Sequence, residues 1–202
     1  MEHRYFLVYK PANMVSQFVS PHPVRLLGAL NYAFPEGTHA VGRLDGDSEG
    51  LLILTTQKKV TRLLFQSEVP HRRTYLVLVK GQPGPEALRH LAMGVDIRVK
   101  GGQTYRTAPC EVEVLPAPPA GYLPNNVPAP VAPGTWLRLT LTEGKFRQVR
   151  KMVAALGYPC RRLIRVAIDG LELAGMQPGE VREVPETEFF RYLNLSECTP
   201  SL

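Results

Sequence analysis

Short apolar runs separated by polar turns recur along most of the chain. Runs of about four to eight apolar residues that end at turn residues are typical of buried β-strands. We therefore expect strands over the ranges 5–9, 51–55, 74–79, 136–141 and 163–168. Within 136–141, leucines alternate with polar residues, which indicates a strand with one buried face.

Four segments between these strands are predicted to be helical: 25–34, 57–66, 85–94 and 148–156. In the second and fourth, apolar residues three and four apart form the stripe of an amphipathic helix. Pro85 begins the third helix and Gly94 ends it, as these residue types do at helix ends. Strands interleaved with helices predict an α+β (mixed α/β) fold.

Proline sets one segment apart, because seven prolines lie between Pro116 and Pro133. Proline lacks an amide donor and fixes φ, so we expect a long surface loop over 116–133. Residues 1–185 are predicted to form a single domain, and 186–202 a C-terminal tail without a clear element.

The charge of the chain permits a polyanionic partner. Its 202 residues include 24 Lys plus Arg and 18 Asp plus Glu, a formal net charge of +6. Residues 145–165 contain seven basic and no acidic side chains, which predicts a local basic surface suited to nucleic acid. The apolar runs are too short for a membrane span or a signal peptide, so we expect a cytoplasmic protein without a membrane partner. The three cysteines are far apart and are expected to be free thiols.

Two polar segments could carry chemistry. The turn Asp45-Gly46-Asp47-Ser48-Glu49-Gly50 concentrates carboxylates between apolar runs. It is compatible with a solvated turn, and it mimics the first half of a calcium loop but has Thr56 where the last ligand should be Glu. The second segment, 143–152, places basic side chains on one side of a predicted helix, beside a glycine and a glutamine, as in sites that handle phosphates.

Together these segments resemble the pseudouridine synthases. Arg43-Leu44-Asp45 followed by Asp47-Ser48-x-Gly50-Leu51-Leu52 is similar to the signature of that family. The flanking Gly42 and the leucine-rich strand narrow the resemblance to the branch that includes the small-subunit rRNA synthase A. Further motifs follow in the order of that branch: Lys10-Pro11, the Tyr75 segment, Glu143-Gly144-x-x-Arg147-Gln148-Val149-Arg150-Lys151-Met152 and Leu163-x-Arg165. The resemblance covers about residues 5–184 and is strongest to the short members that modify large-subunit rRNA and lack an S4 domain.

The resemblance implies a catalytic fold with a mixed, largely antiparallel sheet, flanking helices and a central cleft. It implies isomerisation of a uridine in large-subunit ribosomal RNA, free or in assembling particles, by a monomer. The reaction oxidises nothing and adds nothing, so no cofactor and no metal are expected. The implied catalytic residues are Asp45, with Asp47 as the lesser candidate, Tyr75 beside the base, and Arg150 beside the aspartate. The implied RNA-binding residues are Lys10, Arg43, Arg147, Gln148 and Arg165.

One departure is Lys145, where the family often has arginine; lysine still meets a phosphate, without bidentate geometry. Two other hypotheses fit the same residues. A non-catalytic RNA-binding or ribosome-assembly module would explain the charge but not the Arg-Leu-Asp turn. A hydrolase of glycosidic bonds would use Asp45 with Asp47 or Glu49.

Overall fold

The computed structural model describes residues 2–65, 70–117, 121–122, 134–173 and 175–195. Its strands are β1 (Tyr5–Lys10), β2 (His39–Val41), β3 (Glu49–Thr55), β4 (Arg73–Lys80), β5 (Asp96–Arg98), β6 (Thr104–Arg106), β7 (Glu111–Leu115), β8 (Gly134–Leu141), β9 (Cys160–Ile168), β10 (Leu171–Glu172) and β11 (Val181–Val184). Its α-helices are α1 (Lys59–Phe65), α2 (Pro85–Met93), α3 (Gln148–Ala155) and α4 (Glu186–Tyr192), and its 3-10 helices are η1 (Leu27–Ala29) and η2 (Lys100–Gly102).

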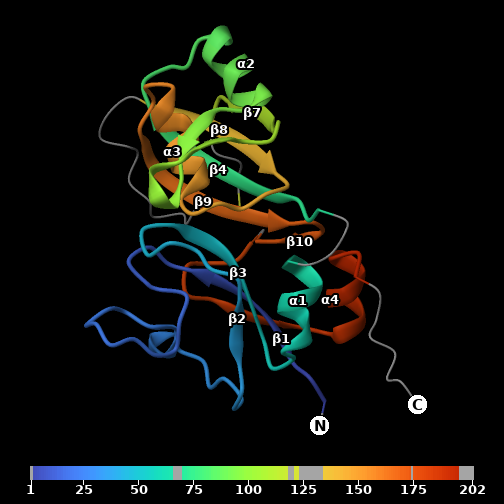
Figure 1. Ribbon diagram of the computed structural model, residues 1–202. Helices are drawn as coiled ribbons and strands as arrows, with labels where there is room; N and C mark the ends of the chain where they lie inside the picture. Colours follow the sequence, from blue (N-terminus) through green and yellow to red (C-terminus); the bar gives the residue numbers. More distant parts are fainter. Residues whose placement is uncertain (1, 66–69, 118–120, 123–133, 174, 196–202) are drawn as a thin grey trace.

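One mixed sheet organises the molecule. Its main path is β11-β1-β3-β9-β4-β8-β7, with β10 added to β9 and β2 added to β3. Among the described strand pairs only β3–β9 is parallel, through Glu49↔Ile164 and Gly50↔Arg165. Figure 1 shows β9 between a half that contains β1, β2 and β3 and a half that contains β4, β7 and β8. This confirms the predicted fold class, a largely antiparallel mixed sheet with helices beside it.

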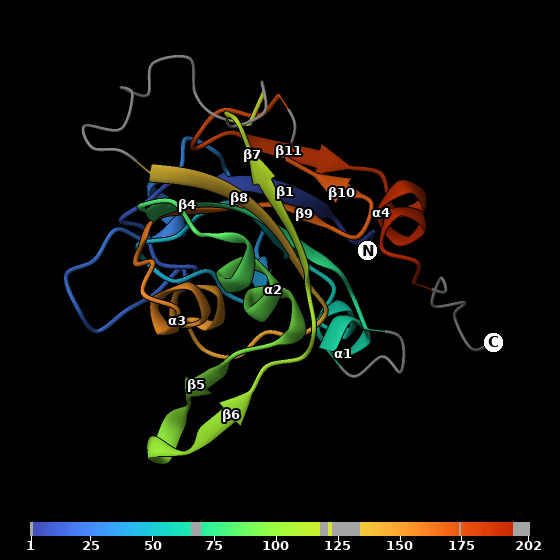
Figure 2. The same cartoon turned by 90° about the horizontal axis from the view of Figure 1, so that it is seen from above.

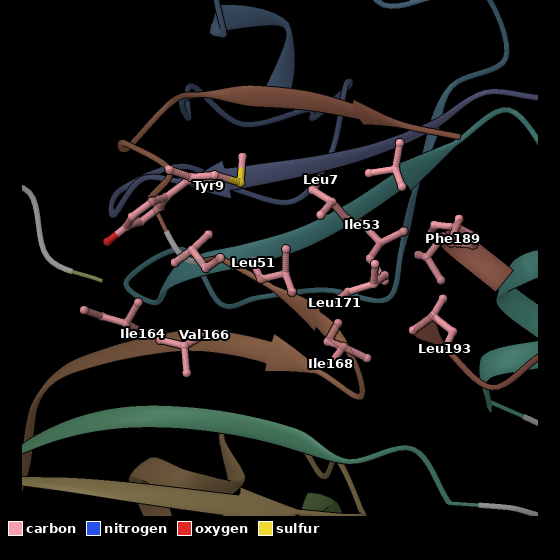
Figure 3. Packing of buried hydrophobic residues seen from close by; sticks show 14 of the residues in the cluster. Leu7, Tyr9, Leu51, Ile53, Ile164, Val166, Ile168, Leu171, Phe189 and Leu193 are labelled. Carbon is pink, nitrogen blue, oxygen red and sulfur yellow. The ribbon is translucent and has the colours of Figure 1, made fainter. Parts of the chain in front are cut away.

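Apolar side chains on one face of the sheet meet between its two halves. Leucines and isoleucines of β1, β3 and β9 point toward one another, and Phe189 and Leu193 close the end of this cluster (Figure 3). α2 and α3 lie together on the other face of the sheet, against Val77 and Val79 of β4. The β5–β6 hairpin projects beyond these helices (Figure 2). Burial of these surfaces, at about 25 cal/mol per Å² of apolar area, stabilises the fold and fixes the strands around the site.

The predicted helix over 25–34 is wrong. Only η1 is helical there, because backbone groups of this segment bond to a neighbouring loop instead of to the preceding turn of a helix. The amide of Leu27 donates to the carbonyl of Gln17, and the carbonyl of Arg25 accepts from the amide of Val15, each at 2.9 Å. Leu27 and Leu30 still become buried.

The other predicted strands and helices are confirmed to within two residues, except that β9 starts three residues earlier than predicted. Residue 66, the predicted end of one helix, lies outside the described residues. The short strands β2, β5, β6, β7, β10 and β11 carried no clear signal. Neither did α4, in the expected tail, where Phe189 stacks on Tyr5 with ring centroids 4.5 Å apart. Most of the predicted proline-rich loop and residues 196–202 lie outside the described residues.

Candidate active site

A cavity of about 310 Å³ opens where β3, β4 and β9 meet the loop before α3. Its walls combine two carboxylates, several cations and aromatic rings. The charged and aromatic residues of the lining, together with one glutamine, are Arg43, Asp45, Phe65, Arg73, Tyr75, Glu143, Lys145, Phe146, Arg147, Gln148 and Arg165. The structure thus brings together six of the eight predicted site residues; Lys10 and Arg150 do not line the cavity.

The turn before β3 presents Asp45 to this cavity. Gly42 adopts φ +74°, which a side-chain-bearing residue rarely does, and lets the chain reverse. The hydroxyl of Ser16 donates to the carbonyl of Leu44 at 2.9 Å and accepts from its amide at 3.0 Å. The amide of Ser48 closes the turn on the carbonyl of Asp45 at 3.0 Å. The Asp45 side chain is therefore held at the cavity wall and stays 24% exposed.

Arg147 is the cation nearest to Asp45, with Nη1 3.8 Å from Oδ2. Its main contact is a bidentate pair with Asp47, at 2.9 and 2.8 Å, which holds the pKa of the Asp47 carboxyl below its ordinary value. Arg147 has φ +53° at the start of α3, a strained conformation for a residue with a side chain. This conformation sets the guanidinium across the two aspartates.

The resemblance places Arg150 beside the catalytic aspartate, but in the structure Arg150 contacts the backbone of the turn that carries Asp45. Its Nη2 donates to the backbone carbonyl of Asp47 at 2.8 Å and lies 3.3 Å from the hydroxyl of Ser48. Among the described residues, Arg150 forms no ion pair with Asp45; its nearest carboxylate is Asp47, at 3.5 Å. The geometry makes Arg150 a positioning residue for the turn and leaves the place beside Asp45 to Arg147.

Tyr75 and Arg165 form the inner wall. They face each other across the β4–β9 pairing, next to a register shift between Thr74 and Tyr75. The Arg165 side chain is buried, and its Nε donates to the carbonyl of Leu51 at 2.8 Å. Burial lowers its pKa from the ordinary arginine value, against the favourable effect of the Tyr75 hydroxyl. A buried guanidinium cannot meet a phosphate on the surface, so the structure gives no support to that expected role of Arg165.

Gln148 and Glu143 brace the loop that carries Arg147. The amide nitrogen of Gln148 donates to Glu143 at 2.6 Å, and its oxygen accepts from the backbone amide of Lys145 at 2.8 Å. Glu143 also accepts from the hydroxyl of Tyr105, at 2.5 Å, and from the amide of Ala108. Gln148 is buried, and this bonding positions the loop.

The remaining expected RNA contacts divide by exposure. Arg43 is exposed at the cavity mouth, where a phosphate could reach it. Lys10 has no exposed surface: its ammonium donates to the carbonyls of Pro11 and Met14 at 2.8 and 2.6 Å. Burial lowers the pKa of Lys10 to about 8. Lys10 therefore ties the loop after β1 together and does not reach the surface where RNA would lie.

The sequence analysis gave no role to five residues of the site: Ser16, Phe65, Arg73, Glu143 and Phe146. Arg73 lies two residues before Tyr75, and Glu143 and Phe146 lie in the motif that contains Arg147, so their positions in the sequence could have indicated them. Ser16 and Phe65 reach the site from distant segments, and no local pattern marks them.

The carboxylates of the turn are engaged with arginines. Asp47 binds Arg147, and Glu49 binds Arg162 through 2.7 and 2.8 Å contacts.

Within the described parts of the chain, no group of three His, Cys, Asp or Glu side chains could hold a metal ion. Cys110 and Cys160 are free thiols, while Cys198 lies outside the described residues. No described helix is long and apolar enough to cross a bilayer.

Comparisons with known proteins agree on one family. The sequence profile described as RNA pseudouridylate synthase matches residues 4–155. The "Ribosomal large subunit pseudouridine synthase E" of Xanthomonas campestris pv. campestris is 39% identical, over 87% of this chain and 92% of that protein. The protein of the same name from Vibrio parahaemolyticus is 35% identical, over 91% and 75%. A solved structure entitled "Crystal structure of pseudouridylate synthase" superposes with a TM-score of 0.76 at 26% identity, over 95% of this chain and 74% of that one.

Proposed function

This chain belongs to the RNA pseudouridylate synthase family, and we propose that its Asp45 cavity converts a uridine of large-subunit ribosomal RNA to pseudouridine. The proteins similar to it from Xanthomonas and Vibrio are named for the large ribosomal subunit, which supports this substrate class. Both proteins are bacterial and are named for the large ribosomal subunit, which supports a cytoplasmic enzyme. The proposal also includes that this enzyme works as a monomer.

The observation that carries the proposal is a carboxylate in a cavity of the right size. About 310 Å³ is within the range of pockets that enclose a small molecule, and a flipped nucleoside fits that class. Asp45 lies in its wall with Arg147 at 3.8 Å, and Tyr75 lines the same cavity. A cation beside a carboxylate keeps it ionised and oriented, as attack on a sugar carbon requires.

The chemistry needs only these side chains. In one route the carboxylate of Asp45 attacks C1′ as the bond from C1′ to N1 breaks; in the other it takes a proton from C2′. The detached base turns and C5 bonds to C1′, as the bond from Asp45 to C1′ breaks in the first route or as C2′ regains its proton in the second. The proton at C5 is then lost and N1 gains a proton. Tyr75 lies where it can stack on the base or take the proton from C5, and exposed Arg43 and Lys145 are placed for phosphates.

The test uses large-subunit rRNA transcript with tritium at C5 of uridine, incubated with the wild-type protein and with Asp45→Ala. We expect tritium release to water by the wild type alone, saturating near one per RNA, and none from small-subunit transcript. Release of free uracil would favour the glycosidic hydrolase. Binding without release, on transcript and on assembling particles, would favour the non-catalytic module.

A further inference from the structure

We infer that the buried guanidinium of Arg165 is the electrostatic anchor that stabilises and retains the detached uracil in the cavity. This rests on the proposed function and replaces the phosphate contact expected for Arg165. The residue is 5% exposed and lines the cavity beside Tyr75, on β9. Its Nη2 atom is buried and has no hydrogen-bond partner.

Arg165 differs from Arg147, Arg150 and Arg162, each of which is paired with a carboxylate. Arg147 and Arg150 approach Asp47, and Arg162 holds Glu49 at 2.7 Å. Among the described residues, no carboxylate lies within ion-pair distance of Arg165. A cation without a counter-ion in a protein interior is costly, because burial removes its hydration and nothing replaces it.

A second cation at the same wall points the same way. Arg73 lines the cavity, is 9% exposed and has no carboxylate partner among the described residues. Its Nη1 donates to the carbonyl of His71 at 3.3 Å, and its guanidinium lies over the ring of Phe65. Arg73 also disfavours the charged form of Arg165, which lowers the pKa of Arg165 further. The inner wall therefore holds two like charges whose counter-charge is missing.

The proposed reaction supplies that counter-charge for part of each turnover. When the bond from C1′ to N1 breaks, the electron pair leaves with N1, and the uracil becomes an anion whose charge is shared with its two carbonyl oxygens. This holds whether Asp45 attacks C1′ or takes the C2′ proton. Fixed charges aimed at the place where charge develops stabilise it without reorganisation. The same attraction keeps the base in the cavity while it turns, which separates an isomerase from a hydrolase.

The test compares Arg165→Met, which is neutral and of similar length, with Arg165→Lys, which keeps the charge. Arg138→Met is the matched control, because Arg138 is exposed on β8 and paired with Glu113. We measure kcat and KM by tritium release on the transcript that the wild type modifies, and the melting temperature of each variant. We expect Arg165→Met to lower kcat about 100-fold, as loss of one such donor does elsewhere, with KM within about three-fold of wild type.

Arg165→Lys is expected to retain at least about ten times the kcat of Arg165→Met, since it restores the cation. Arg165→Met is expected to melt no lower than Arg138→Met, because removing an unpaired buried charge removes its desolvation cost. An Arg165→Met kcat within two-fold of wild type would overturn the inference, as would a loss that follows unfolding. Absence of tritium release by the wild type would instead overturn the proposed function.

Discussion

At Gly50, strand β3 lies directly against the backbone of β9, and Gly50→Ala should separate the two strands. A Cβ built there would overlap the carbonyl oxygen of Arg165 and lie 2.7 Å from its amide nitrogen. Both of these are backbone atoms and cannot rotate away. Gly50 also has φ +103°, where an L side chain is strained.

The magnitude follows from these contacts. Left-handed strain costs about 1–2 kcal/mol, and loss of hydrogen bonds at the short parallel β3–β9 contact adds about 1 kcal/mol for each bond. With the shift of β9, the total is about 3–5 kcal/mol of unfolding free energy. For a chain of this size that lowers the melting temperature by about 6–20 °C. Displacing Arg165 by about an ångström should also lower kcat about 100-fold in the folded fraction.

Thermal melting and tritium release below the melting temperature measure both effects. Gly28→Ala is the control, because an added Cβ there meets nothing within 4 Å and φ is ordinary. If Gly50→Ala melted within about 2 °C of the wild type, a shift that corresponds to under 1 kcal/mol, the close contact between β3 and β9 would be refuted.

Three further predictions concern the residues around the cavity. Asp47→Asn should lower kcat about ten-fold, because it weakens the contact that orients Arg147. It should change the unfolding free energy by under about 1 kcal/mol, because the ion pair is partly exposed. An unchanged kcat would contradict this prediction. Phe146→Ala should leave stability unchanged, because the residue is 74% exposed. It should weaken RNA binding about five- to ten-fold if the ring stacks on a base. Unaltered RNA binding would show that Phe146 does not stack on a base. The wild type should gain unfolding free energy relative to Lys10→Met as pH rises from about 8 to 10.5, in denaturant melts.

The sign of the Lys10 prediction follows from where the proton leaves first. The pKa is about 8 in the folded protein and 10.5 in an ordinary lysine, so within that window the unfolded chain binds the proton that the folded chain has lost. Stability therefore rises with pH across the window, and below about pH 8 Lys10 contributes no slope. Parallel curves for the wild type and Lys10→Met would show that the buried ammonium does not titrate there.

Much of the fold could be predicted because its signals are local. Burial of one face or of both faces of an element gives apolar positions that repeat with the period of that element. Such patterns mark the strands β1, β3 and β4 and the helix α3. The prediction of a helix over 25–34 was wrong because backbone groups of this segment form hydrogen bonds with a neighbouring loop. The α4 helix escaped prediction because its two phenylalanines are adjacent and show no stripe, although they fill the space beside Tyr5.

The sequence by itself determined the strands, the acidic turn at Asp45 and the basic segment before and within α3, since each depends on neighbours along the chain. Only the tertiary structure decided which cation stands beside Asp45, and that Lys10 and Arg165 are buried. Burial and ion pairing depend on which segments meet in space. Here Gly50 of β3 pairs with Arg165 of β9, far along the chain, and this contact turns an expected surface arginine into part of the cavity wall.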